Sequence, residues 1–396
     1  MIAIERKNLM NFIVTSPHFP ENFENFSVRL AANGITTLGI GDEEYQNLSV
    51  NLREALTEYY KVNDMENYEE MYRAVAYFAF KYGKIDRLES QNEHWLFQDA
   101  RLRTDFNIPG YKLADIDVIK YKSKMKEVFK KHHIPVAAGA AFKTDKEAKK
   151  LLKKFDYPVI IKPDSGVGAS DTYKVTNEVD FADFLQKKRS NVAYFMEEFI
   201  EGDIITFDGL TDQNGKIVFY SSLVYMEPAL ETVNRGGDMY YYETRDISKD
   251  LYEYGVKSVA AFDVRERFFH FEFFRTKDGK LYALELNCRP PGGASIDLMN
   301  HAHELDLFDE YAHIVKENKF YRTNDCYYYS VYISRNNKRT YRYDEEMIKE
   351  KYGYALKDIQ TVPGVFAEVM GDIGYIFNTK TKSELLKIVD FVSQVK

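Results

Sequence analysis

Short apolar runs alternate with polar, helix-compatible stretches over the N-terminal part of the chain. The runs at 11–16 and 35–41 have the length of strands, and the polar stretch between them extends to about Asn33. Helical spacing of apolar residues over 67–86 predicts an amphipathic helix. This order of strand, helix and strand predicts a small α/β layer on a parallel sheet. No GxGxxG turn follows the first strand, which argues against a dinucleotide site there.

Beyond about residue 120 the pattern favours short strands, several of them joined by tight turns. A basic amphipathic helix begins near Lys120 and ends before Pro135, and Asp212–Gly215 has the composition of a hairpin turn. Residues 228–245 show no periodicity and are expected to form a loop, whereas 320–396 predict a mixed α/β tail. The strands that we expect lie at 157–163, 171–175, 193–202, 203–210 and 216–225, with a helix over 178–188.

Composition limits the classes of protein to which the chain can belong. A chain of 396 residues suits two to three domains, and its net charge of −8 argues against nucleic acid as the main partner. Cys288 and Cys326 are its only cysteines, too few for a disulfide framework or a cysteine metal site. Neither a secretion signal nor an apolar stretch of membrane-spanning length is visible, so we expect a cytoplasmic protein without a membrane partner.

The segment 270–293 holds the most informative pattern. Asp278–Gly279 between two alternating runs predicts a hairpin with a two-residue turn. In that register Glu272 lies opposite Glu285, and His270 lies opposite Asn287. Opposed side chains of a hairpin are about 5 Å apart at Cβ, so two ionised carboxylates there repel unless a cation lies between them.

This predicted hairpin offers hard oxygen ligands on one face. Glu285, Asn287 and Arg289 share a face by the strand period of two. Carboxylate and amide oxygens suit Mg²⁺, and a neighbouring arginine suits a phosphate or an acyl phosphate. An ordinary solvent-exposed strand face is the alternative interpretation. The Pro290–Gly293 segment and the surrounding apolar residues favour a lined cleft.

A second pattern typical of phosphate binding starts at Lys162, which ends an apolar strand directly before a glycine-bearing turn. Backbone N–H groups of such a turn can cradle phosphate oxygens, and the lysine adds positive charge. The turn is not a Walker loop, and taken by itself the pattern favours the tip of an ordinary hairpin. Lys122 lies on a lysine-rich helix whose default interpretation is a solvated face. Glu197–Glu198 at a strand end could bind an adenine amino group or remain solvated.

The order of these segments resembles the ATP-grasp superfamily, in the branch of biotin carboxylase, carbamoyl phosphate synthase and the carboxylate–amine ligases. The segments are the basic helix, the Lys162 strand with its flap, Glu197–Ile200, and Glu272 followed by Glu285-x-Asn287-x-Arg289. The similarity covers about residues 110–315, and the preceding segment is similar to the small domain that comes before the grasp. The resemblance implies α/β and α+β architecture, with an ATP-grasp fold after a small Rossmann-like parallel α/β domain.

The resemblance also implies a role for each matching residue. Glu272, Glu285 and Asn287 would hold Mg²⁺, with Mn²⁺ as the alternative ion, and Arg289 would be the catalytic residue that steadies the transferring phosphoryl group. Glu197 would meet the adenine amino group, and the two lysines would contact the phosphates of ATP. The nucleotide-binding residues that it implies are Lys122, Lys162, Ser165, Gly166, Gly168, Ser170, Glu197, Glu198, Phe199, Ile200 and Asp203.

Two positions depart from the family pattern. The acidic residue that usually binds the ribose should fall near Ile204, and Asp203 is one place away. The Asp-Lys pair common before the first grasp helix is Tyr121–Lys122 here. These departures put the ribose contact in doubt and make Lys162 a firmer assignment than Lys122.

The expected function is an ATP-dependent ligase that activates a carboxylate as an acyl phosphate and couples it to an amine. The alternatives are a carboxylase similar to biotin carboxylase and a non-catalytic ATP sensor. We expect an N-terminal domain over 1–110, a small grasp subdomain with the phosphate flap over 111–192, and a large subdomain with the tail over 193–396. The partners would be small carboxylates and amines, and the interpretation allows a homodimer. Arg235 and Tyr240–Tyr242 would shape the substrate pocket, and a surface loop without a substrate role is the alternative. The sequence does not name the substrates.

Overall fold

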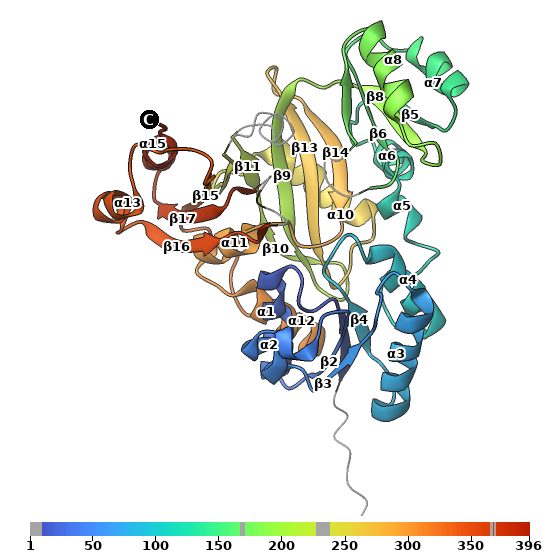
Figure 1. Ribbon diagram of the computed structural model, residues 1–396, viewed down its shortest axis with the longest axis vertical. Coiled ribbons are helices and arrows are strands. Elements are labelled where there is room, and N and C mark those ends of the chain that lie inside the picture. Colours follow the sequence, from blue (N-terminus) through green and yellow to red (C-terminus); the bar gives the residue numbers. More distant parts are fainter. Residues whose placement is uncertain (1–9, 167–170, 227–237, 365–366, 368–369) are drawn as a thin grey trace, which may run out of the picture.

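Three sheets organise the chain, from the N-terminal domain at the bottom of Figure 1 to the small sheet at its upper right. The computed structural model describes residues 10–166, 171–226, 238–364, 367 and 370–396. No helix within these ranges has the length and apolar character needed to cross a bilayer.

The N-terminal sheet is parallel, as the strand–helix rhythm predicts. Its four strands are ordered β3-β2-β1-β4, and α1 lies against the large sheet through α12. Because the strands are parallel, their carboxyl ends meet at one edge, where ligands usually bind in such sheets. The strands are β1 (Asn11–Thr15), β2 (Thr36–Gly41), β3 (Glu58–Lys61) and β4 (Arg87–Glu89), and the helices are α1 (Glu24–Ala32), α2 (Val50–Ala55), α3 (Tyr68–Tyr82) and α4 (Leu96–Asp105).

A small antiparallel sheet of four strands follows, in the order β5-β8-β6-β7. Phe181 and Phe184 of α8 pack on one face of it with Val159 and Ile161 of β6. The predicted hairpin at 157–175 is present as β6 and β7. The elements are β5 (Gly139–Phe142), α7 (Asp145–Leu152), β6 (Val159–Pro163), β7 (Tyr173–Val175), α8 (Glu178–Lys187) and β8 (Tyr194–Glu198), preceded by α5 (Asp117–Lys120) and α6 (Lys122–Lys131).

A nine-stranded antiparallel sheet forms the centre of the molecule. Its path is β14-β13-β9-β11-β12-β15-β17-β16, and β10 pairs with β9 across the predicted Asp212–Gly215 turn. The strands are β9 (Gly202–Thr211), β10 (Ile217–Ser221), β11 (Leu223–Tyr225), β12 (Tyr240–Glu243), β13 (Phe268–Thr276), β14 (Leu281–Asn287), β15 (Tyr329–Arg335), β16 (Leu356–Thr361) and β17 (Ile373–Thr379). The helices are α10 (Lys249–Ala261), α11 (Ser295–His303), α12 (Leu307–Glu317), α13 (Glu345–Tyr352) and α15 (Lys382–Ser393).

The prediction of a loop over 228–245 is wrong near its C-terminal end, because Tyr240–Glu243 forms the inner strand β12. Tyr241 belongs to one core cluster with Tyr332, whereas Tyr242 belongs to another with Tyr329. A strand buried on both faces shows no alternation of apolar and polar residues, which explains why its sequence lacks a strand signal. The part of the expected loop at 227–237, including Arg235, lies outside the described residues.

The predicted domain boundaries remain a proposal. The sheet to which each strand belongs refines the second of these boundaries. Residues 194–198 of β8 pair with β5 and β6, whereas the large sheet begins at Gly202. We therefore place the second boundary at about residue 200 rather than after residue 192.

Candidate active site

The carboxylate hairpin has the predicted pairing at the positions that matter. Glu272 of β13 lies opposite Glu285 of β14, and His270 lies opposite Asn287. The turn itself differs from the prediction, since Thr276 N–H donates to the carbonyl of Lys280 and three residues form the loop. That change shifts the register by one residue near the turn.

A β-bulge restores the register before the carboxylates are reached. Phe273 pairs with Ala283 while Glu272 pairs with Glu285, so Leu284 is the extra residue on β14. The longer loop takes Lys277 out of the first strand, and the bulge inserts Leu284 into the second strand, so the two one-residue shifts compensate. The expected pairing of the two glutamates is therefore correct although the expected turn is not.

Glu272 and Asn287 belong to a buried polar network centred on His270. The Nε2 atom of His270 lies 3.1 Å from Glu272 Oε1, and its Nδ1 atom lies 2.6 Å from Asp208 Oδ1. The Asn287 amide donates to the same Glu272 oxygen over 3.4 Å. Burial lowers the pKa of His270, but the charges and hydrogen bonds of Asp208 and Glu272 outweigh burial and raise it to about 10. The sequence gives no signal for Asp208, because only the pairing of β9 with β13 brings it opposite His270.

Lys122 faces the hairpin rather than solvent. Its ammonium lies 3.5 Å from Glu285 Oε2, and only 8% of the residue's surface is exposed. The start of α6 is fixed on the end of β6, because Asp164 accepts hydrogen bonds from the Ser123 N–H and hydroxyl at 2.7 Å each. Burial raises the pKa of Glu285, but the positive charges of Lys122 and Lys162 outweigh burial and lower it.

Lys162 is paired with Glu197 instead of standing free at the root of the flap. Its ammonium lies 2.7 Å from Glu197 Oε1, and Lys126 lies 2.9 Å from the second oxygen of the same carboxylate. Burial lowers the pKa of Lys126, whereas the charges of Glu197 and Glu285 more than offset burial at Lys162 and raise its pKa. Lys126 follows Lys122 by one helical turn, which is the signal that could have identified it.

The lysine pairing changes how Glu197 is interpreted. Each oxygen of the Glu197 carboxylate already lies beside the ammonium group of a lysine. This arrangement favours a role in positioning the two lysines over a role as hydrogen-bond acceptor for an adenine. Glu198 is exposed, and it accepts a hydrogen bond from the Ala138 N–H over 3.2 Å. The Phe199 ring lies under the Lys174 ammonium at 3.9 Å, Ile200 is half-buried, and Asp203 is exposed at the start of β9 opposite Arg275.

The flap is described only at its base. Asp164 is buried, Ser165 and Gly166 are exposed, and Gly168 and Ser170 lie outside the described residues. Of the segment after β6, the structure describes Asp164, Ser165 and Gly166, and the phosphate-binding role of the flap stays a prediction.

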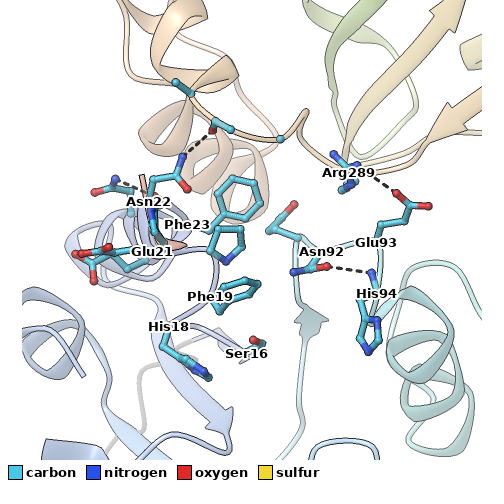
Figure 2. A pocket seen from close by; sticks show the side chains of 18 of the residues that line it. Ser16, His18, Phe19, Glu21, Asn22, Phe23, Asn92, Glu93, His94 and Arg289 are labelled. Carbon is cyan, nitrogen blue, oxygen red and sulfur yellow. Dashed lines mark hydrogen bonds and ion pairs between the residues drawn. The ribbon is translucent and has the colours of Figure 1, made fainter. Parts of the chain in front are cut away.

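Arg289 connects this cluster to the N-terminal domain. Its guanidinium lies 3.2 Å from Glu93 Oε2, and both side chains are mostly buried. Figure 2 shows this pair at one wall of a cavity of about 860 Å³. Residues that follow β1, β2 and β4 also line the cavity, at the carboxyl edge of the parallel sheet; among them are Ser16, His18, Asp42, Asn92 and Trp95.

The cavity and the carboxylate cluster are neighbouring parts of one site. Arg289 lines the cavity, whereas the two glutamates of the hairpin and the three lysines do not. The lysine–glutamate cluster has the charges for a polyphosphate and a divalent metal, and the cavity has the size for a small organic molecule. Glu272, Glu285 and Asn287 supply hard oxygen atoms on one hairpin face, a donor set that fits Mg²⁺.

Residues 155–297 match the family model described as "ATP-grasp domain". This segment of the chain is an ATP-grasp domain. The matched segment contains Lys162, Glu197 and the whole carboxylate hairpin. It ends inside α11, after Arg289.

Relatives with related folds carry ligase or carboxylase names. The L-arginine-specific L-amino acid ligase of Bacillus subtilis is 24% identical over 258 residues, which are 63% of this chain and 62% of that protein. The L-amino acid ligase of Bacillus licheniformis superposes with a TM-score of 0.73 at 14% identity, covering 96% of both chains. The biotin carboxylase domain of Hydrogenobacter thermophilus 2-oxoglutarate carboxylase, solved with MgADP and bicarbonate, gives a TM-score of 0.67 at 17% identity, covering 94% of this chain and 87% of that one. These structural similarities establish the ATP-grasp fold.

Proposed function

We propose that this ATP-grasp protein is an ATP-dependent ligase that joins a small carboxylic acid to an amine through an acyl phosphate. The observation that carries the proposal is the convergence of three lysines and a carboxylate hairpin beside a cavity walled by Arg289. The name of the Bacillus subtilis relative supports an amino-acid ligase in particular.

The proposed roles follow from the charge of each group. Lys122, Lys126 and Lys162 would hold the phosphate oxygens of ATP, and the Glu197 carboxylate keeps two of these ammonium groups in place. Glu272, Glu285 and Asn287 would hold Mg²⁺, which when bound neutralises charge that develops on the phosphoryl oxygens. The His270 network orients the Glu272 carboxylate toward that position.

The reaction would proceed in two displacements. A carboxylate oxygen of the first substrate attacks the γ-phosphorus in line, the bond to the β-phosphate oxygen breaks, and ADP leaves. The amine nitrogen then attacks the acyl carbon, inorganic phosphate leaves, and the nitrogen loses a proton. Arg289 at the cavity wall would bind the carboxylate and then the acyl phosphate in forked geometry. Closure of the site would protect the acyl phosphate from water.

The cavity is proposed as the site of the two organic substrates. Its wall combines the Arg289 guanidinium with acidic side chains such as Glu21 and Asp42, and with aromatic rings such as Phe19 and Trp95. Opposite charges on the two sides of one cavity suit a substrate that carries a carboxylate and an ammonium group, as an amino acid does.

A screen for ADP release tests this proposal. The purified chain would be mixed with MgATP and pairs of amino acids and small carboxylic acids, with ADP measured enzymatically and products identified by mass spectrometry. We expect ADP release that depends on both substrates and a product whose mass equals their sum minus water. Glu285→Gln would serve as the inactive control.

The alternative functions predict different results in the same screen. A carboxylase would release ADP with bicarbonate as the only acid, and a sensor would bind ATP in calorimetry without releasing ADP. Failure to bind ATP at millimolar concentration would contradict all three functions.

A further inference from the structure

A second cluster of titratable side chains lies where β12, the end of α11 and the segment before β15 meet. Glu243 ends β12, His303 ends α11, and Cys326 lies in the segment that leads into β15. One potential ligand atom from each of the three residues lies within 4.8 Å of the other two. Glu243 and His303 are buried, and Cys326 is partly exposed.

The polar atoms in this cluster lack the partners that buried groups normally have. Among the described residues, Glu243 Oε2 and both ring nitrogens of His303 have no hydrogen-bond partner. The hydroxyl of Ser222, whose N–H points at Glu243 over 3.4 Å, has none either. The same is true of Ser330, which is paired with Glu243 across β12 and β15. Each unpartnered buried polar group costs about 1–3 kcal/mol, so such a group is usually satisfied by an ion or by water.

Among the described residues, the Glu243 carboxylate has only the His303 imidazole as an ion-pair partner. Nε2 of His303 lies 3.5 Å from Glu243 Oε1, and no lysine or arginine forms an ion pair with Glu243 in the described part of the chain. Burial raises the pKa of Glu243, the neighbouring imidazole of His303 offsets part of that rise, and the negative charge of Asp208 adds to it. A cation at this point would neutralise the negative charge of the Glu243 carboxylate, and it could bind an unpartnered nitrogen of the His303 imidazole.

We propose that Glu243, His303 and Cys326 form a structural site for a divalent metal of the zinc class. Carboxylate, imidazole and thiolate are all zinc ligands, and a fourth position is open to a neighbouring hydroxyl or to water. Tetrahedral zinc with bonds of about 2.0–2.3 Å separates its ligand atoms by roughly 3.3–3.8 Å, so the observed cluster needs only a small contraction. Magnesium prefers an all-oxygen set and would choose the carboxylate hairpin instead.

The thiol of Cys326 must lose its proton to bind. Burial raises its pKa to about 12, Glu243 adds to that rise, and the Sγ atom lies 3.3 Å from the carbonyl of Tyr328. A metal reverses this preference, since a coordinating thiol is deprotonated and its proton is released to solvent. The expectation that two cysteines are too few for a metal site therefore applies to cysteine-only sites and does not cover this mixed ligand set.

The position of the cluster indicates what the metal would do. The hydroxyl of Tyr241 on β12 accepts a hydrogen bond from the Ala294 N–H, just before α11 begins. Glu243 lies two residues further along the same strand and faces His303 at the other end of the helix. A metal would thus fix the second end of α11 on β12. Because α11 follows the loop that carries Arg289, this anchor stabilises the wall of the active-site cavity.

Cobalt substitution tests the proposal with the wild-type chain. Metal-free protein would be titrated with Co²⁺ in excess Mg²⁺, so that the oxygen ligands of the hairpin are occupied. We expect one equivalent of Co²⁺ to produce a thiolate-to-cobalt absorption band in the near ultraviolet. Cys326→Ser should abolish the band, whereas Cys288→Ser, the control at the second cysteine, should keep it.

Further variants and a labelling experiment separate binding from folding defects. His303→Gln should weaken Co²⁺ binding at least about tenfold, and His301→Gln on the same helix should leave it unchanged. In the wild-type chain, one equivalent of Zn²⁺ should protect Cys326 from alkylation, as read by peptide mass spectrometry. A wild-type titration without a thiolate band, or alkylation that Zn²⁺ does not slow, would overturn the proposal and leave water as the partner of these buried atoms.

Discussion

Glu197 and Glu198 are sequence neighbours with opposite environments. Successive side chains of a strand point to opposite faces of the sheet, so Glu197 is buried between Lys126 and Lys162 while Glu198 is exposed. The buried Glu197 carboxylate offsets the repulsion between the positive charges of Lys126 and Lys162. The two positions therefore form a matched pair for measuring what the cluster contributes.

We predict that Glu197→Gln destabilises the protein by about 3–5 kcal/mol, because it leaves two buried lysine charges without their partner. Glu198→Gln should change the free energy of unfolding by less than about 0.5 kcal/mol. Urea denaturation measures both values, and calorimetry with MgATP should show weaker binding only for Glu197→Gln. Equal effects of the two variants would contradict the role assigned to Glu197.

Asp297, in the first turn of α11, gives a pH-dependent prediction. Burial raises its pKa to about 6, and the hydrogen bond from Gln360 offsets only part of that rise. The unfolded carboxyl titrates near about 3.9, so the folded chain holds the proton more tightly. The stability that this carboxyl contributes is full below about pH 4 and is lost as the pH rises through 6.

Asp297→Asn removes that titration. We expect the variant to gain stability relative to the parent protein between pH 4 and pH 7, by on the order of 2 kcal/mol. Thermal unfolding across this pH range measures the difference between the two curves. A difference that stays constant with pH would show that folding does not raise the pKa of Asp297.

At the scale of the element, the β13–β14 hairpin places both glutamates on one face. Its three-residue loop and its bulge at Leu284 compensate, so Glu272 and Glu285 are opposed as in a regular hairpin. Each carboxylate also has its own cationic neighbour, His270 for Glu272 and Lys122 for Glu285. This arrangement supports one shared magnesium position.

We predict that Glu272→Gln and Glu285→Gln each raise the Mg²⁺ concentration needed for turnover and add several kcal/mol to the barrier of the chemical step. The double variant should lose little more than the worse single variant, because residues that act as a unit are not additive. Asp278→Asn, in the exposed loop of the same hairpin, is the control and should keep full activity. Additive losses in kcat would mean that the two carboxylates act independently.

At the scale of the whole molecule, buried ion pairs join the N-terminal domain to the large sheet. Glu89 at the end of β4 contacts Arg103 of its own domain and Arg267 beside β13. Arg87 binds Glu266 through two hydrogen bonds of 2.6 and 2.8 Å. The ion pair between Glu93 and Arg289 lies in the same interface. Docking of the two domains therefore also builds the wall of the cavity.

We predict that Glu89→Gln destabilises the protein by about 3–5 kcal/mol, because two buried guanidinium groups lose their shared carboxylate. Unfolding in urea should become less cooperative, with the N-terminal domain separating first. Glu66→Gln, which removes an exposed ion pair with His94 in the same domain, is the control. A single cooperative transition at the parent midpoint would contradict the importance of this junction.

The sequence by itself determined the features that depend on residues close together in the chain. These are the parallel N-terminal layer, the Asp212–Gly215 turn, the Lys162 strand and the opposed pair Glu272 and Glu285. Local backbone preferences and the strand period of two are sufficient for the turn and the strands. The opposed pair of glutamates also depends on the compensation between the longer loop and the bulge at Leu284. The order of these segments was also sufficient to indicate the ATP-grasp superfamily, which the match over residues 155–297 confirms.

Only the tertiary structure decided which distant side chains meet. It paired Lys126 and Lys162 with Glu197, placed Arg289 against Glu93, and gathered Glu243, His303 and Cys326 under α11. Such contacts depend on how sheets and helices pack, and the sequence pattern of a single segment carries no record of its partner. Strand β12 was missed for a related reason: packing buries both of its faces, and burial on both sides removes the alternation from which a strand is recognised.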